Sequence, residues 1–160
     1  MSISRKVTES LKELGLTLSP KPSYDIPELP RDITLLDDDG LMDLFVQFTQ
    51  WTDHLSGVRA IAVINEREAE RALDTREAQL MLEGWAAGSK QTVTVQKAAL
   101  AANAEIVSLK DEVDTKYAYR KIIETRAETV ERDSQVVSRE LTRRTSEISS
   151  FRGRSRRFSP

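Results

Sequence analysis

The chain has 160 residues, of which 39% are hydrophobic, 31% charged and 6% aromatic, with a formal net charge of -2 and no cysteine. This composition is typical of one soluble domain, and the lack of cysteine excludes disulfides, thiolate metal sites and a cysteine nucleophile. No apolar run approaches 18 residues, and residues 1–18 lack the apolar centre of a signal peptide, so we expect a cytoplasmic protein without a membrane contact.

The small net charge conceals a separation of charge along the chain. Between positions 25 and 43 there are seven acidic residues against one arginine, whereas between positions 139 and 160 there are seven arginines against two glutamates and no lysine. The chain is therefore acidic early and basic at its end, which points to an interaction of the basic end with an anionic partner.

Residues 1–15 are predicted to contain a short helix, with Ser4 as its N-cap, Val7, Leu11 and Leu14 on one face, and Gly15 as its stop. Four prolines follow within residues 16–36, so this stretch is expected to be an extended linker rather than a helix. Ile26 and Leu29 could anchor the linker on a neighbouring surface, or the linker could be a plain flexible tether.

A long helix is predicted from residue 37 onward, because Asp37, Asp38 and Asp39 offer an N-cap and negative charge at its start. Its apolar stripe then thins to Ala69 and Ala72 among charged residues, and the helix should end between Gly84 and Gly88. The expected core positions of this helix are Leu41, Leu44, Phe45, Phe48, Trp51, Leu55, Val58 and Ala62.

A polar turn at residues 89–94, a short helix at residues 95–102 and a second long helix complete the order. Asn103 is the expected N-cap of the last helix, which should run from Ala104 to about Ser150. Its apolar positions fit an alternating three- and four-residue grid, which is the pattern of a coiled coil. They are Ile106, Leu109, Val113, Ile123, Val130, Val137, Leu141 and Ile148, and the grid is interrupted by Lys116, Arg120, Ala127, Ser134 and Arg144.

These elements predict an all-α fold in which residues 37–150 form a long antiparallel helical hairpin with a short connecting helix. One hairpin would expose much of its apolar stripe, so the core positions are also expected to support a homo-oligomer. The charges within the second stripe argue against a uniform two-stranded coiled coil. Residues 151–160 are expected to form a flexible, arginine-rich tail.

The sequence shows no set of residues that would support catalysis, and we expect neither an enzyme nor a bound metal or cofactor. His54 is the only histidine, and its neighbour Asp53 points about 100° away around the helix, so an interface or surface position is favoured. The three aspartates at positions 37–39 lack the alternating spacing of a calcium loop. Residues 84–90 lack the spacing of a phosphate-binding loop.

The arginine-rich end is the remaining functional signal. Guanidinium groups bind phosphates and stack on bases, and an aromatic ring among them offers a platform for an unpaired base. The alternatives are an arm that docks on the acidic segment of a neighbouring subunit, and a solvated terminus. The residues predicted to contact DNA are Arg139, Arg143, Arg144, Arg152, Arg154, Arg156, Arg157 and Phe158.

The order of these elements resembles that of the UvsY-type recombination mediators of bacteriophages. The resemblance covers roughly residues 29–145. It rests on Leu29-Pro30 before an acidic helix start, the 51–55 region, the polar turn at residues 90–94, and the helical stretches 117–121 and 137–141. It implies an oligomeric ring that binds single-stranded DNA and helps load a recombinase onto DNA covered by single-strand-binding protein.

We therefore expect a non-enzymatic phage recombination or replication accessory protein, acting in the cytoplasm of the infected cell. Its partners would be other copies of itself, single-stranded DNA, and a recombinase or single-strand-binding protein. One alternative is a structural component of the phage particle, either a scaffold or a DNA-packaging protein built from helical hairpins. Another is a coiled-coil adaptor between two proteins that makes no contact with nucleic acid.

Overall fold

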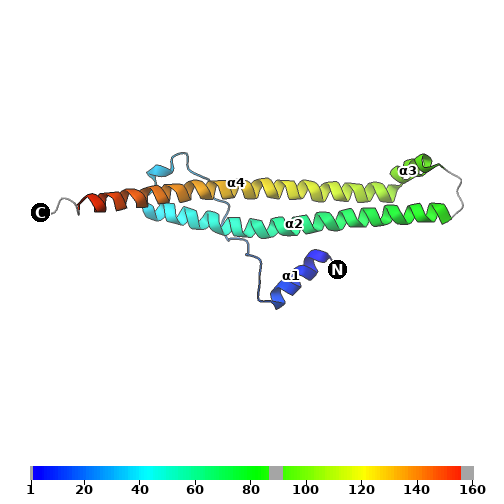
Figure 1. Cartoon of the computed structure of the whole chain (residues 1–160), viewed down its shortest axis with the longest axis horizontal. Helices are drawn as coiled ribbons and strands as arrows, with labels where there is room; N and C mark the ends of the chain where they lie inside the picture. Colours follow the sequence, from blue (N-terminus) through cyan, green and yellow to red (C-terminus); the bar gives the residue numbers. More distant parts are fainter. Residues whose placement is uncertain (1, 87–91, 156–160) are drawn as a thin grey trace. The chain divides into compact units, whose positions relative to one another are not determined.

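The computed structural model describes the backbone of residues 2–86 and 92–155, and the side chains of residues 2–84 and 92–147. All regular structure in these ranges is helical (Figure 1). The helices are α1 (Ile3–Glu13), the 3₁₀ turn η1 (Ile33–Leu35), α2 (Asp38–Ala86), α3 (Val93–Ala101) and α4 (Ala104–Ser155). The chain packs as two compact units: unit 1 comprises Met1–Leu18 and Val58–Glu124, and unit 2 comprises Ser19–Gly57 and Thr125–Pro160.

The two long helices pack antiparallel, as the sequence predicts. In unit 2, Arg144 near the end of α4 pairs with Asp38 at the start of α2. In unit 1, Arg76 towards the end of α2 pairs with Glu105 at the start of α4. The short helix α3 connects α2 to α4 in sequence, so the predicted all-α hairpin is confirmed.

Polar residues set the ends of the helices. Asp37 Oδ1 accepts from Gly40 N–H at 2.8 Å, which is the predicted aspartate cap of α2. A side chain at position 40 would bring its Cβ within 2.8 Å of that same oxygen, which explains the glycine. Asn103 Oδ1 likewise accepts from Glu105 N–H at 2.9 Å and caps α4 as predicted.

The short helix α1 differs from its prediction at one end. Ser2, not Ser4, is its N-cap and accepts from Arg5 N–H, because the helix begins two residues before the start that a Ser4 cap implies. At the other end Gly15 adopts φ +73°, and Leu16 N–H donates to Leu11 O at 2.9 Å. This is a Schellman ending, which confirms Gly15 as the stop.

Two other helix boundaries were misplaced from sequence. The connecting helix runs over Val93–Ala101 rather than residues 95–102, with Thr92 at its N-cap. The helix α4 continues to Ser155 rather than ending at about Ser150. The backbone is therefore still helical at the first positions of the predicted flexible tail, and residues 156–160 lie outside the described residues.

Unit 2 contains the principal apolar core of the described chain. Its central side chains come from α2 and α4, and Leu44, Phe45, Ala127 and Leu141 pack around them. Phe48 and Val137 are fully buried. The buried members of this core are Leu41, Phe48, Trp51, Leu55, Val130 and Val137.

The proline-rich segment is part of that core rather than a free tether. Tyr24, Ile26, Leu29, Ile33 and Leu36 all pack against it, which confirms Ile26 and Leu29 as anchors. The segment also contains the 3₁₀ turn η1, a feature that the sequence reading missed. A fully extended linker over residues 16–36 is therefore wrong for positions 33–35.

His54 holds the same segment from the side of α2. Its Nδ1 lies 2.9 Å from the carbonyl oxygen of Ser19, and its ring meets that of Trp51 edge-on with centroids 5.7 Å apart. These contacts give the histidine a place on the helix surface where the linker begins.

Most of the buried side chains of unit 1 are small or charged. Ala62, Ala69 and Ile106 are buried, and Val58, Leu109, Val113 and Ile123 are half-buried at their predicted inward positions. Ala72, predicted to continue the stripe, is instead exposed.

Charged residues occupy inward positions in unit 1. Glu66 is 7% exposed and forms an ion pair with Arg120, one of the residues that interrupt the apolar grid. Arg59 and Lys110 make further ion pairs between the helices, with Glu124 and Glu77. The inward charge of Arg120 on α4 is therefore paired with a carboxylate from α2.

None of the helices in the described ranges has an apolar stretch of the length and purity that a bilayer crossing requires.

Candidate nucleic-acid interface

The arginines predicted to contact DNA begin on α4 within unit 2 and take different roles there. Arg139 is exposed and has no ion pair or side-chain hydrogen bond among the described residues. Arg143 is half exposed and bonds Glu140 and Glu147 of its own helix. Arg144, one residue further on, lies 100° around the helix and points toward the start of α2.

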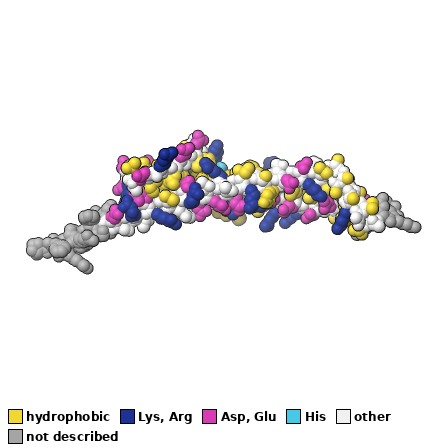
Figure 2. Space-filling view, turned by 90° about the horizontal axis from the view of Figure 1, so that it is seen from above, with side chains coloured by type: hydrophobic (Ala, Val, Ile, Leu, Met, Phe, Trp, Pro, Cys, Tyr) yellow, Lys and Arg dark blue, Asp and Glu magenta, His cyan; other side chains and the backbone are white. Residues whose placement is uncertain are grey.

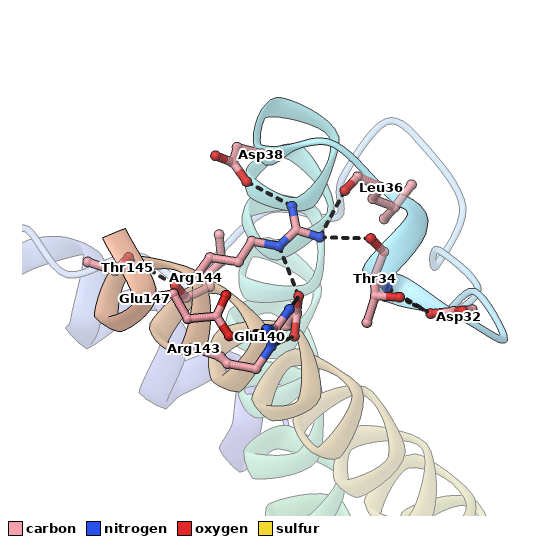
Figure 3. Close-up of polar contacts among 10 residues, drawn as sticks. Asp32, Thr34, Leu36, Asp38, Glu140, Arg143, Arg144, Thr145 and Glu147 are labelled. Carbon is pink, nitrogen blue, oxygen red and sulfur yellow. Dashed lines mark hydrogen bonds and ion pairs between the residues drawn. The ribbon is translucent and has the colours of Figure 1, made fainter. Parts of the chain in front are cut away.

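Arg144 is held by four acceptors, one from α2, one from η1, one from the residue after η1 and one from α4 itself (Figure 3). Its guanidinium donates to Asp38 Oδ1 at 2.7 Å and to Glu140 Oε1 at 2.9 Å. It also donates to the carbonyl oxygens of Leu36 at 2.9 Å and Thr34 at 3.2 Å. With only 17% of its side chain exposed and four of its five N–H groups engaged, Arg144 ties the turn η1 to α4 and is not free to bind a phosphate as a bidentate donor.

Glu140 links the two arginines. It is 7% exposed, and its carboxylate accepts from Arg143 at 2.7 and 2.8 Å and from Arg144 at 2.9 Å. Hydrogen bonds from Arg143 and then from Arg144 lower the pKa of Glu140 from 4.5 to about 2. The same bonds raise the pKa of Arg143, so both charges persist at neutral pH.

The low pKa of Glu140 predicts an acid-sensitive fold. A carboxylate whose folded pKa lies below its unfolded value stabilises the fold above pH 4.5, and this contribution is lost as the pH falls towards about 2. A Glu140→Gln variant is therefore expected to lose less stability than the wild type between pH 5 and pH 3. Thermal unfolding followed by circular dichroism at each pH measures this difference, with Glu128→Gln, an exposed glutamate of the same helix, as control. Identical pH dependence in wild type and Glu140→Gln would contradict it.

A further arginine joins the exposed face, which we call the basic ridge and define as Arg132, Arg139 and Arg143. All three are exposed, and at 100° per residue Arg139 and Arg143 lie within about 20° of the direction of Arg132. The sequence reading missed Arg132, although its position seven residues before Arg139 signals the shared face. Exposed Gln135, Thr142 and Ser146 add polar groups beside them.

The basic ridge is narrow. On the face of the molecule seen in Figure 2, basic and acidic side chains alternate, and no broad area of one sign covers it. Arg132 bonds the adjacent Asp133 at 3.2 Å, while Arg139 is unpaired among the described residues. Beyond Arg143 the backbone of α4 stays helical to Ser155.

The remaining predicted DNA contacts lie at residues 152–158. The backbone at Arg152 and Arg154 is helical, but their side chains lie outside the described ones. Arg156, Arg157 and Phe158 lie outside the described residues altogether.

Within the described residues there is no group of three or more histidine and acidic side chains that could hold a metal ion. The aspartates at positions 37–39 instead have separate roles, since Asp37 caps α2 and Asp38 binds Arg144.

Comparison with known proteins found no matching family model, no matching curated protein and no matching solved structure.

Proposed function

We propose that this chain is a non-enzymatic, self-associating phage accessory protein that binds single-stranded DNA and assists recombination or replication. In this proposal the helical hairpins assemble, the basic end of α4 contacts DNA, and a recombinase or single-strand-binding protein is the further partner. The observation that carries the proposal is the basic ridge, which leads along a helical backbone into the segment with Arg152, Arg154, Arg156 and Arg157.

The spacing of the basic ridge suits a phosphate backbone. Arg132 and Arg139 are about 10 Å apart along the helix axis, and Arg139 and Arg143 about 6 Å, at 1.5 Å per residue. Arg139 and Arg143 can therefore meet neighbouring phosphates of an extended strand, and Arg132 can reach a phosphate further along it. Contacts of this kind bind without reading sequence and weaken with salt.

A single strand suits this arrangement better than a duplex. Its bases are unpaired, so the arginine planes and the aromatic rings of Phe151 and Phe158 can stack on them. A single strand also bends easily, so it can follow a narrow ridge and then a short basic segment.

Self-association is supported by exposed apolar side chains in both units. Met42 and Val46 in unit 2 are 50% and 44% exposed, and Tyr119 and Ile122 in unit 1 are 51% and 68% exposed. Assembly would bring several basic segments onto one strand, and the resulting avidity would compensate for a weak single contact.

The test of the proposal compares two arginines of the same helix. Arg139→Ala removes the unpaired cation of the basic ridge and is expected to weaken binding of a labelled single-stranded oligonucleotide about threefold to tenfold at low salt. Arg126→Ala is the matched control, because Arg126 is equally exposed and unpaired among the described residues but lies about 120° around α4 from Arg132.

Fluorescence anisotropy with single-stranded and duplex oligonucleotides of one sequence measures both affinities. The proposal expects the single strand to bind more tightly and only Arg139→Ala to weaken it. Equal losses for Arg126→Ala and Arg139→Ala would show that the ridge is not the contact, and tighter duplex binding would overturn the single-strand assignment.

A further inference from the structure

The helix α2 carries a second, outward-facing row of residues in unit 2. We call it the outer seam and define it as Asp39, Met42, Val46, Thr49 and Asp53. These positions follow one another at gaps of three and four residues, so they lie within an arc of about 80° on the helix. All five side chains are exposed, with Met42 at 50% and Val46 at 44%.

The outer seam has an apolar centre and an acidic residue at each end. Among the described residues, neither Asp39 nor Asp53 has an ion pair or a side-chain hydrogen bond, unlike the neighbouring Asp37 and Asp38. The two carboxylates are about 21 Å apart along α2. Its apolar centre and two acidic ends are complementary to a short segment that combines aromatic side chains with positive charge and has no acidic residue.

We propose that the outer seam binds the basic C-terminal segment of a second copy of this chain. Residues 151–158 contain Phe151 and Phe158 together with four arginines, and no acidic residue. The phenylalanines would cover Met42 and Val46, and the guanidinium groups would pair with Asp39 and Asp53. The start of α2 already binds one guanidinium group from α4, since Arg144 donates to Asp38 at 2.7 Å.

The length of the chain assigns the segment to another copy. Arg144 meets Asp38, so α4 passes the start of α2 at position 144. From there α4 runs about 16 Å further to Ser155, while Met42 lies about 6 Å in the opposite direction. Three residues from Ser155 to Phe158 span at most about 11 Å, which is half of the roughly 22 Å between those levels. Phe158 therefore cannot return to the outer seam of its own chain.

A contact of this kind joins two different surfaces of identical chains. Such head-to-tail interfaces generate rings when the rotation closes and filaments when it does not. The proposed contact between subunits uses the same arginine segment as the proposed DNA contact. A neighbouring subunit and DNA are therefore expected to compete for that segment. Its test is made without DNA, so its failure is distinguishable from failure of the proposed function.

The test uses disulfide trapping in the full chain, which has no natural cysteine. Val46→Cys chains are mixed with Ser159→Cys chains that carry a size tag, and the mixed disulfide dimer is measured after mild oxidation. Val107→Cys is the matched control, because Val107 is a helix-surface valine at 43% exposure in unit 1.

We expect the mixed dimer with Val46→Cys to form at least about fivefold faster than with Val107→Cys, because docking raises the local concentration of the two thiols. Adding Asp39→Asn and Asp53→Asn to the Val46→Cys chain should remove most of this difference. Asp111→Asn and Asp114→Asn, exposed acids of unit 1, should leave it unchanged. Equal rates for Val46→Cys and Val107→Cys, or no effect of the two outer-seam changes, would overturn the proposal.

Discussion

Replacement of Phe48 by alanine is expected to lower the free energy of unfolding by about 3–5 kcal/mol, which is the usual cost of removing a buried aromatic side chain. Phe48 is fully buried in the unit 2 core. The loss combines the transfer free energy of the ring with the cavity that remains. Because this core also holds the proline-rich segment, the variant should release that segment as well.

Urea unfolding followed by far-UV circular dichroism measures this effect, at one fixed protein concentration because self-association would add to stability. Leu35→Ala is the control, since Leu35 is a large apolar residue of the same unit with 82% of its surface exposed. Its change should stay within about 0.5 kcal/mol. A similar loss in both variants would mean that Phe48 is not in a packed core.

Among the described residues, the sequence predicted the inward positions of both long helices correctly apart from Ala72, which is exposed. A spacing of three and four residues keeps side chains on one face whatever the neighbouring helix is, so the pattern is readable without a structure. The described positions that interrupt the α4 grid, such as Lys116 and Ser134, are half-buried as the grid requires. The helix ends at Asp37, Asn103 and Gly15 could also be predicted from the sequence, because each depends on a local interaction within one turn.

The partners of the inward charges were not predictable in the same way. Glu66 and its neighbours look alike in sequence, and only the register between α2 and α4 places Glu66 beside Arg120. Register depends on the packing of residues far apart in the chain. A charged residue in a helical stripe therefore predicts that a partner is needed without saying which residue it is.

The different roles of two adjacent arginines at the candidate interface were also not predictable from their residue type. Arg143 and Arg144 are adjacent and chemically identical, yet a turn of 100° exposes the first and directs the second into the corner of α2 and η1. The grid did mark position 144 as inward. Arg132 and Arg139 were recoverable from the same periodicity, applied to the outer face rather than the inner one.

Replacement of Arg152, Arg154, Arg156 and Arg157 together by glutamine is expected to weaken binding to single-stranded DNA by about two to three orders of magnitude at low salt. Each phosphate contact contributes about -0.7 to the slope of log affinity against log salt on a single strand. Loss of four contacts should therefore reduce the magnitude of that slope by about 3, and the difference from wild type should shrink as salt rises. Anisotropy titrations at several salt concentrations measure the slope directly.

The matched control replaces the same four arginines by lysine, which keeps the charge but removes the planar, bidentate and stacking group. The lysine variant should retain most of the salt slope and lose affinity by a smaller factor. Phe158→Ala isolates stacking from charge, because it should weaken binding by about 1–3 kcal/mol for one base while the slope stays the same. If the glutamine variant kept the wild-type slope, the basic end of α4 would not be the DNA contact, whatever the oligomer does.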